Sequence, residues 1–240
     1  MNIGLQPFLQ EFDYTSSFWS IVNVAGTAPS ARWGAAGGID PRVTNNALTN
    51  TLYMAGGFDG KKIYDLSEVW AFDIAGTLSS NLPNQTTGTW SQKSISNTIA
   101  GRVGIGGTVL GQKIVAVGGC TSASSSQAIL DASCAVQDAQ VIDTSNGGIL
   151  APKPCLAARI DPVVVPNMNS GSSVFGDQVF VLLGTFNSTL WNDGGGLKDG
   201  EVVGVIMSRL SHDRSNLLYR RCSTQDLVGL CLPSRCLQWC

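Results

Sequence analysis

Charged residues, histidine and long apolar runs are all scarce in this sequence. Asp, Glu, Lys and Arg make up 13% of the 240 residues, against about 25% in average globular chains. Disordered chains are rich in charge and poor in apolar residues, so a hydrophobic content of 43% excludes that class. The formal net charge of −2 supplies no basic surface for nucleic acid, and we expect no nucleic-acid partner.

No apolar run approaches the 18 or more residues of a membrane span, and the densest is Val179–Leu183. We therefore expect no transmembrane segment. Residues 1–14 have neither the basic region nor the continuous apolar core of a signal peptide. The cysteine usage and two N-x-S/T sequons, at Asn84 and Asn187, nevertheless favour an extracellular or cell-surface parent protein over a cytoplasmic one. For a secreted parent, the natural N-terminus is expected upstream.

Glycine is abundant, with 28 residues or about 12% against about 7% in average chains, and it ends several short apolar strands. The apolar pattern has a period of 2 or forms short continuous runs, which indicates strands rather than helices. Three segments share the pattern: Thr51–Gly57, Gln112–Gly119 and Asp177–Gly184. Their glycines are separated by 62 residues (Gly56 to Gly118) and 66 residues (Gly118 to Gly184). Such regular spacing is typical of repeat architectures.

Other features recur in step with these strands. An arginine begins each unit, and a second apolar strand follows each glycine-ended strand after a polar loop. The arginines are Arg32, Arg102 and Arg159, and the second strands are Ser67–Ile74, Ala135–Asp143 and Gly200–Ile206. Four short strands per unit, separated by Gly, Asn, Asp and Ser turns, are typical of a propeller blade.

The order of arginine, apolar strand, double glycine and spaced aromatics resembles a kelch repeat. The residues that carry the resemblance are Arg32, Gly56, Gly57, Trp70 (or Tyr64) and Trp90 in the first unit, Gly118 and Gly119 in the second, and Gly184 in the third. The first unit matches best; the second lacks the aromatics, and Thr185 follows Gly184 in the third. A strand that must end in a sharp turn between crowded sheets needs φ > 0, which glycine reaches without strain.

The resemblance implies an all-β fold: a partial kelch-type β-propeller of about three four-stranded antiparallel blades. We expect it to be open rather than closed, because propellers close with roughly 4–8 blades. The expected organisation is an N-terminal extension (1–16), the last strand of a preceding blade (17–24), two blades (31–95 and 101–153), an incomplete blade (158–206) and a tail (209–240). Our hypothesis is an incomplete propeller that lacks sequence at both ends.

The tail differs in composition, with five of the 15 Lys and Arg residues, four of the seven cysteines and the only histidine, His212. Kelch propellers also form the body of galactose oxidase-like copper radical enzymes, which need two histidine ligands. The tail cysteines lack the paired C-x2-C spacing of zinc sites. We therefore expect no catalytic residue, no cofactor and no metal ligand in this chain. Acidic loop residues such as Asp59 and Asp65 occur where aspartate usually forms turns.

Three functions stay open. The first is a non-catalytic kelch-type module that binds an unidentified protein or glycan through its loops. The loop 57–66 carries Phe58, Lys61, Lys62 and Tyr64, a mixture suited to a partner's surface but also to a solvated hairpin tip. The second is a fragment of a copper radical oxidase whose metal ligands are missing from this chain, and the third is a product without function. Cys120 and Cys134 bracket a small polar loop that a disulfide is able to close.

Overall fold

The computed structural model describes residues 10–13, 17–41, 49–75, 87–122, 134–151, 158–168, 178–186, 189–190, 202–206 and 219–222. Every named element in these ranges is a β-strand, which confirms the prediction of an all-β chain. No sheet among these residues closes on itself. The same ranges contain no helix of the length and apolarity that crossing a membrane requires.

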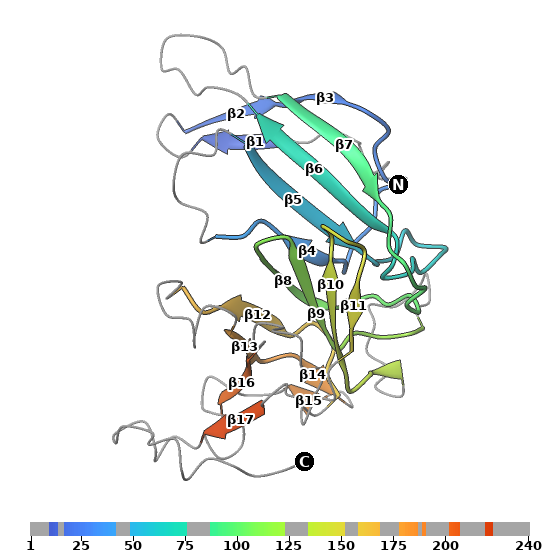
Figure 1. Cartoon of the computed structure of the whole chain (residues 1–240), viewed down its shortest axis with the longest axis vertical. Helices are drawn as coiled ribbons and strands as arrows, with labels where there is room; N and C mark the ends of the chain where they lie inside the picture. Colours follow the sequence, from blue (N-terminus) through green and yellow to red (C-terminus); the bar gives the residue numbers. More distant parts are fainter. Residues whose placement is uncertain are drawn as a thin grey trace.

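The strands form three main sheets that follow one another along the long axis of the molecule (Figure 1). The first contains β4 (Ala36–Gly38), β5 (Thr49–Ala55), β6 (Val69–Ala75) and β7 (Thr87–Lys93), with β3 (Asn23–Ala25) added beside β7. The second contains β8 (Gly106–Leu110), β9 (Lys113–Val117), β10 (Ala139–Asp143) and β11 (Ile149–Leu150). The third contains β12 (Val163–Pro166), β13 (Gln178–Leu182), β16 (Val202–Ile206) and β17 (Tyr219–Cys222).

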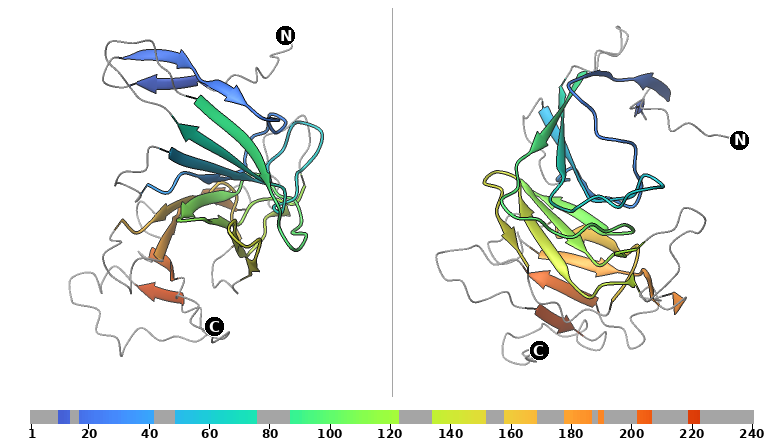
Figure 2. Two further views of the ribbon diagram at one scale, coloured as in Figure 1. Left: turned by 45° about the horizontal axis from the view of Figure 1, so that its top comes forward. Right: turned by 90° about the vertical axis from the view of Figure 1, so that its right-hand side faces the viewer.

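Apart from β3, neighbouring strands in these sheets are antiparallel and follow one another in chain order, and two hairpins complete the structure. One hairpin pairs β1 (Gln10–Asp13) with β2 (Phe18–Ile21), and the other pairs β14 (Thr185–Phe186) with β15 (Thr189–Leu190). The sheets stack face to face, as the turned views show (Figure 2).

The second sheet is buried on both faces. Toward the first sheet, Ile114, Ala116 and Ile142 join a buried cluster that includes Tyr53 and Val69. Toward the third sheet, the alternate residues of the same strands join another cluster: Val115, Val117 and Val141 with Val164, Val179 and Val181. A strand segment buried on both faces is apolar at every position, which explains the continuous apolar run over the last four residues of β9, from Ile114 to Val117.

The structure differs from the expected organisation at the two ends of the described chain. Instead of one strand over 17–24, the chain forms β2 and β3 and changes partner at the buried Val22. β2 pairs with β1, which lies within the expected extension 1–16, whereas β3 runs parallel to β7. The third sheet has four strands, and its fourth, β17, comes from the basic region 209–240. Backbone pairing does not require an apolar pattern, so the sequence Tyr-Arg-Arg-Cys carries no strand signal.

Candidate functional site

The same backbone construction occurs three times at one end of the stacked sheets, where β5, β9 and β13 end. The residue after each unit-starting arginine forms an antiparallel bridge with a residue just beyond the strand end: Trp33 with Phe58, Val103 with Cys120, and Ile160 with Thr185. We call this the glycine end, formed by residues 30–35, 56–68, 101–105, 118–120, 158–161 and 183–185. The described residues that directly follow the glycine-ended strands thereby lie together on one side of the molecule.

Each of these strands ends at two consecutive residues that have positive φ angles. The two residues after the strand have φ of 69° and 93° at Gly56 and Gly57, and 64° and 92° at Gly118 and Gly119. In the third unit the corresponding angles are 58° at Leu183 and 99° at Gly184. Gly184 therefore corresponds to the second glycine of the other pairs, Gly57 and Gly119. From the spacing in the sequence, it had been aligned with the first glycine of each pair. Leu183 adopts a left-handed conformation that costs a branched side chain about 1–2 kcal/mol.

Neighbouring units are joined through these glycines. The Gly57 N–H donates to the Arg102 carbonyl (2.8 Å), and the Gly119 N–H donates to the Arg159 carbonyl (2.9 Å). A side chain at Gly118 would collide with the next unit, since its Cβ would lie 2.3 Å from the Arg159 carbonyl oxygen. The glycines therefore allow close approach between sheets as well as the sharp turn.

Each unit-starting arginine binds the carbonyl at the first of the two left-handed positions. Arg32 donates to Gly56 O (3.3 Å), Arg102 to Gly118 O (3.4 Å) and Arg159 to Leu183 O (2.9 Å). The side chains of Arg32 and Arg102 are 1% and 6% exposed, and Arg159 is also buried. The sequence indicated that an arginine begins each unit, and the structure supplies the reason. The guanidinium of the arginine donates a hydrogen bond to a backbone carbonyl that has no partner strand.

Sequence reasoning missed the acids that pair with these arginines. Arg32 Nη2 lies 2.8 Å from Glu68 Oε1, and both terminal nitrogens of Arg102 bind the two carboxylate oxygens of Asp138. Trp70 Nε1 also donates to Glu68 Oε1 (3.2 Å), which gives this predicted aromatic a polar role. Each acid directly precedes the third strand of its sheet, β6 or β10, and that position was the available signal. Glu201 has the same position before β16 and lies outside the described residues.

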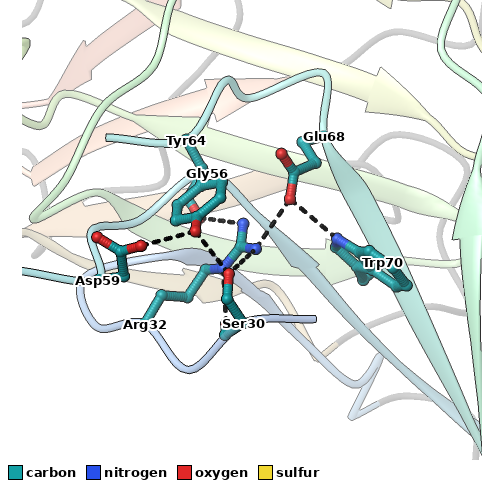
Figure 3. Close-up of polar contacts among 7 residues, drawn as sticks. All are labelled: Ser30, Arg32, Gly56, Asp59, Tyr64, Glu68 and Trp70. Carbon is teal, nitrogen blue, oxygen red and sulfur yellow. Dashed lines mark hydrogen bonds and ion pairs between the residues drawn. The ribbon is translucent and has the colours of Figure 1, made fainter. Parts of the chain in front are cut away.

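A polar network orders the loop of the first unit (Figure 3). The Arg32 guanidinium carbon lies 3.5 Å from the centre of the Tyr64 ring, and Lys62 Nζ lies 4.7 Å from it. The Tyr64 hydroxyl donates to Asp59 Oδ2 (2.7 Å) and accepts a hydrogen bond from Ser30 Oγ (2.6 Å). This cation–π and hydrogen-bonded arrangement fixes one conformation of the loop.

The network also sets the charge state of its acids. Hydrogen bonds from the Lys62 N–H, the Tyr64 hydroxyl and the Lys61 N–H lower the pKa of Asp59 from 3.8 to about 2. Burial raises the pKa of Glu68, but the hydrogen bonds from Arg32 and Trp70 outweigh it and leave this pKa below its usual value. Both carboxylates are therefore held ionised by their partners.

Asp59→Asn is expected to lower the thermal midpoint at neutral pH and to leave it unchanged at strongly acidic pH. The folded pKa of Asp59 is below the unfolded one, so its stabilisation is present above pH 3.8 and is lost as the pH falls to about 2. The measurement is thermal unfolding of both proteins from neutral to strongly acidic pH. Asp65→Asn, which removes an exposed charge from the same loop, is the control. A gap between wild type and Asp59→Asn that stays constant across this range would contradict the assignment.

The remaining predicted residues have varied positions. Trp90 packs on Phe72 with ring centroids 4.7 Å apart, on the face of the first sheet that points away from the second. A disulfide joins Cys120 to Cys134, whose Cα atoms are 4.8 Å apart. Asn84, Asn187 and His212 lie outside the described residues, as do the last three cysteines. Among the residues that are described, no three His, Cys, Asp or Glu side chains lie close enough to hold a metal ion.

One aromatic residue of the glycine end remains accessible. Trp33 is 43% exposed, and its ring meets the buried Phe58 edge-to-face with centroids 5.8 Å apart. The bridge between the two residues and the network around the neighbouring Arg32 fix the Trp33 backbone. Nothing in the sequence distinguishes this tryptophan from the others. What distinguishes it is its place in the structure, beside the loop that carries Lys61 and Lys62.

The chain is thus an all-β protein of stacked antiparallel sheets. No family model matches the sequence, and no curated protein matches it. Among solved structures, it is similar to a chain of the "Cryo-EM structure of RAG in complex with one melted RSS and one unmelted RSS", with a TM-score of 0.60 and 11% sequence identity. The match covers 90% of this chain and 59% of the other. At this identity the similarity concerns the fold alone.

Leu183→Gly is expected to raise the free energy of unfolding by about 0.5–1 kcal/mol, because glycine removes the cost of a left-handed leucine but adds entropy to the unfolded chain. Urea unfolding measures the change. Leu183→Ala is the matched control, since it truncates the same half-exposed side chain and keeps the conformational cost. An equal increase in the free energy of unfolding in both variants would show that the effect comes from loss of the leucine side chain and not from relief of its positive φ.

Proposed function

We propose that the chain is a non-catalytic kelch-type β-propeller module that binds a protein or glycan partner through the glycine end. The kelch-like order of sequence features supports the propeller part of the proposal. Three four-stranded antiparallel arrangements, each ended by positive-φ residues and an arginine, agree with blades that repeat around an axis. In such folds the loops at the ends of rigid sheets are the usual binding surface.

The observation that carries the binding part is the exposed Trp33 beside the lysine-bearing loop. A tryptophan offers a large rigid contact area with a polar N–H, and such residues dominate binding surfaces. Trp33 lies on an ordered frame, so little conformational entropy is lost when a partner contacts it. Lys61 and Lys62 are exposed in the loop that follows Phe58, the bridge partner of Trp33, and add positive charge to the glycine end. A partner with an apolar patch next to acidic groups would fit it.

The acids of this surface favour binding over catalysis. Asp59 accepts hydrogen bonds from two backbone N–H groups and from the Tyr64 hydroxyl. A carboxylate with so low a pKa is a weak general base near neutral pH. Glu68 is engaged by Arg32 and Trp70 in the same way. Both side chains therefore have a structural role that explains their position.

The test is a binding screen of the 240-residue chain on a glycan array and a panel of extracellular proteins, followed by measurement of Kd for each ligand. Trp33→Ala and Lys62→Glu are expected to weaken binding at least tenfold. Trp19→Ala is the matched control, because Trp19 is 67% exposed on β2, outside the glycine end. Ligands whose Kd is unaffected by Trp33→Ala, or the absence of any ligand in both screens, would overturn the proposed surface.

A copper titration tests the catalytic alternative. Stoichiometric copper uptake with the absorbance of a protein radical would contradict a non-catalytic module, whatever the binding screens return.

A further inference from the structure

Adjacent units meet at the glycine end through one repeated junction. Each junction has one main-chain hydrogen bond in each direction, between the strand-end corner of one unit and the segment that begins the next unit. The bonds are Gly57 N–H to Arg102 O (2.8 Å) and Ile105 N–H to Gly34 O (3.3 Å) at the first junction, and Gly119 N–H to Arg159 O (2.9 Å) and Asp161 N–H to Gly104 O (2.7 Å) at the second. The first and second units are therefore each bound by the unit that follows.

A side-chain contact completes each junction. Val103 and Ile160, which form the bridges of the second and third units, are 0% and 1% exposed. Val103 Cγ2 lies 2.7 Å from the position of a Cβ on Gly34, and Ile160 Cγ2 lies 2.6 Å from that of a Cβ on Gly104. The bridge residue of one unit is thus covered by the preceding unit, at the residue after that unit's own bridge.

The third unit presents one half of a further junction. Gly184 corresponds to Gly119 by its place after the strand end, and Asp161 corresponds to Gly104 because each follows the bridge residue of its unit. Among the described residues, neither the Gly184 N–H nor the Asp161 carbonyl has a hydrogen-bond partner. In the second unit, the corresponding N–H of Gly119 and carbonyl of Gly104 are both bound.

The first unit presents the other half. The Arg32 carbonyl corresponds to that of Arg102, and it has no hydrogen-bond partner in the described ranges. Trp33 corresponds to the buried Val103 but is 43% exposed. The second sheet lies between the first and the third (Figure 1), so one copy of the chain does not bring its own two halves together.

We propose that the first unit of one copy docks on the third unit of a second copy, so that the two halves form a junction between molecules. The Arg32 carbonyl accepts the N–H of Gly184 of the second copy, and Trp33 packs on Asp161 of the second copy as Val103 packs on Gly34. A contact between two different surfaces is head-to-tail, so association continues to a ring or to a longer row of copies.

Asp161 suits a tryptophan at this place. Its side chain remains accessible, although burial of part of it raises the pKa of the carboxyl. No described residue offsets this cost with a hydrogen bond or an ion pair to the carboxylate. The indole N–H of Trp33 is a donor, and a hydrogen bond from it would favour the charged form of Asp161. The other two units have Gly34 and Gly104 at this position, so the carboxylate belongs to the unit that lacks a following partner.

Sedimentation velocity of the full chain over a wide concentration range tests the contact. The mean mass is expected to rise with concentration. Trp33→Glu is expected to weaken association roughly tenfold or more, because it removes the packing residue and places a carboxylate beside Asp161. The addition of Asp161→Lys is expected to restore association, because opposite charges then face each other. Trp19→Glu is the matched control, since Trp19 is 67% exposed on β2, outside the glycine end.

Two further measurements keep the outcome decisive. Circular dichroism and thermal unfolding show whether each variant folds, and hydrogen exchange of the wild-type chain reads the contact without substitution. The Gly184 amide is expected to exchange more slowly at high concentration. A chain that stays monomeric at the highest concentration overturns the contact. So does association that the folded Trp33→Glu variant retains, that Trp19→Glu weakens equally, or that Asp161→Lys does not restore.

This contact rests on the proposed binding role of Trp33 and makes a second copy the protein partner of that surface. The two proposals fail separately. A monomeric chain that binds a ligand of the screens with a Kd sensitive to Trp33→Ala overturns the second copy as partner and leaves the proposed function standing. A monomeric chain without any ligand overturns both.

Discussion

Gly118→Ala is expected to lower the free energy of unfolding by about 3 kcal/mol, or to prevent folding altogether. Gly118 has φ of 64°, which costs an alanine about 1 kcal/mol. The added Cβ would also lie 2.3 Å from the Arg159 carbonyl oxygen, a backbone atom that accepts the Gly119 N–H. Relief requires that the second and third sheets move apart, and such overpacking typically costs a further 1–3 kcal/mol.

Gly111→Ala separates these two causes. Gly111 lies in the turn between β8 and β9 with φ of 62°, and a Cβ there would meet nothing within 4 Å. This variant is expected to lose only about 1 kcal/mol, the conformational cost alone. Denaturant unfolding of both variants gives the difference, which measures the close approach between sheets. Equal losses would show that the sheets are not held together at Gly118 as tightly as this geometry requires.

The glycine end was predictable where a backbone requirement selects a residue type. Gly56, Gly57, Gly118 and Gly119 were recognised because φ > 0 at a strand end strongly favours glycine. Leu183 escaped notice, since a leucine in the same conformation carries no signal in the sequence. The second and third strands of each sheet were predictable in the same way, from short apolar runs of regular spacing.

Long-range pairings were not predictable, because they depend on backbone contacts between segments far apart in the sequence. The parallel pairing of β3 with β7 joins residues more than 60 positions apart through main-chain groups that every residue carries. The pairing of β17 with β16 extends the third sheet into a basic segment whose composition suggested a separate region. The composition of a segment indicates how much apolar surface it can bury, and a strand at the edge of a sheet needs to bury little apolar surface.

The sequence showed that an arginine begins each unit, but the ion pairs that these arginines form were not predicted from it. Asp138 lies 36 residues after Arg102, and Glu68 lies 36 residues after Arg32; this shared separation, with the place of each acid before an apolar strand, was the signal in the sequence that went unused. What unites the pairs is geometry: each acid directly precedes a third strand, and each arginine starts a unit whose backbone carbonyl it also binds. One guanidinium thereby ties the start, the glycine turn and the third strand of its unit together.

That triple role predicts a large effect for Arg102→Met. Methionine keeps most of the apolar stem but removes the hydrogen bonds to Gly118 O and to both oxygens of Asp138. Breaking a buried ion pair by removing one partner typically costs 3–5 kcal/mol. The Asp138 side chain is 30% exposed and regains some hydration, so a loss of about 2–3 kcal/mol is expected.

A double-mutant cycle with Asp138→Ala determines whether the pair acts as a unit. Asp138→Ala alone leaves a buried guanidinium without its carboxylate and is expected to cost about 2 kcal/mol. In the Arg102→Met background the same substitution is expected to cost little, since the carboxylate it removes keeps only the hydrogen bond from Gln140 Nε2 (3.3 Å) there. The coupling measured by denaturant unfolding is therefore expected to be about 1–3 kcal/mol. Strict additivity would mean that Arg102 stabilises the turn through Gly118 alone, and that the acids before β6 and β10 have another role.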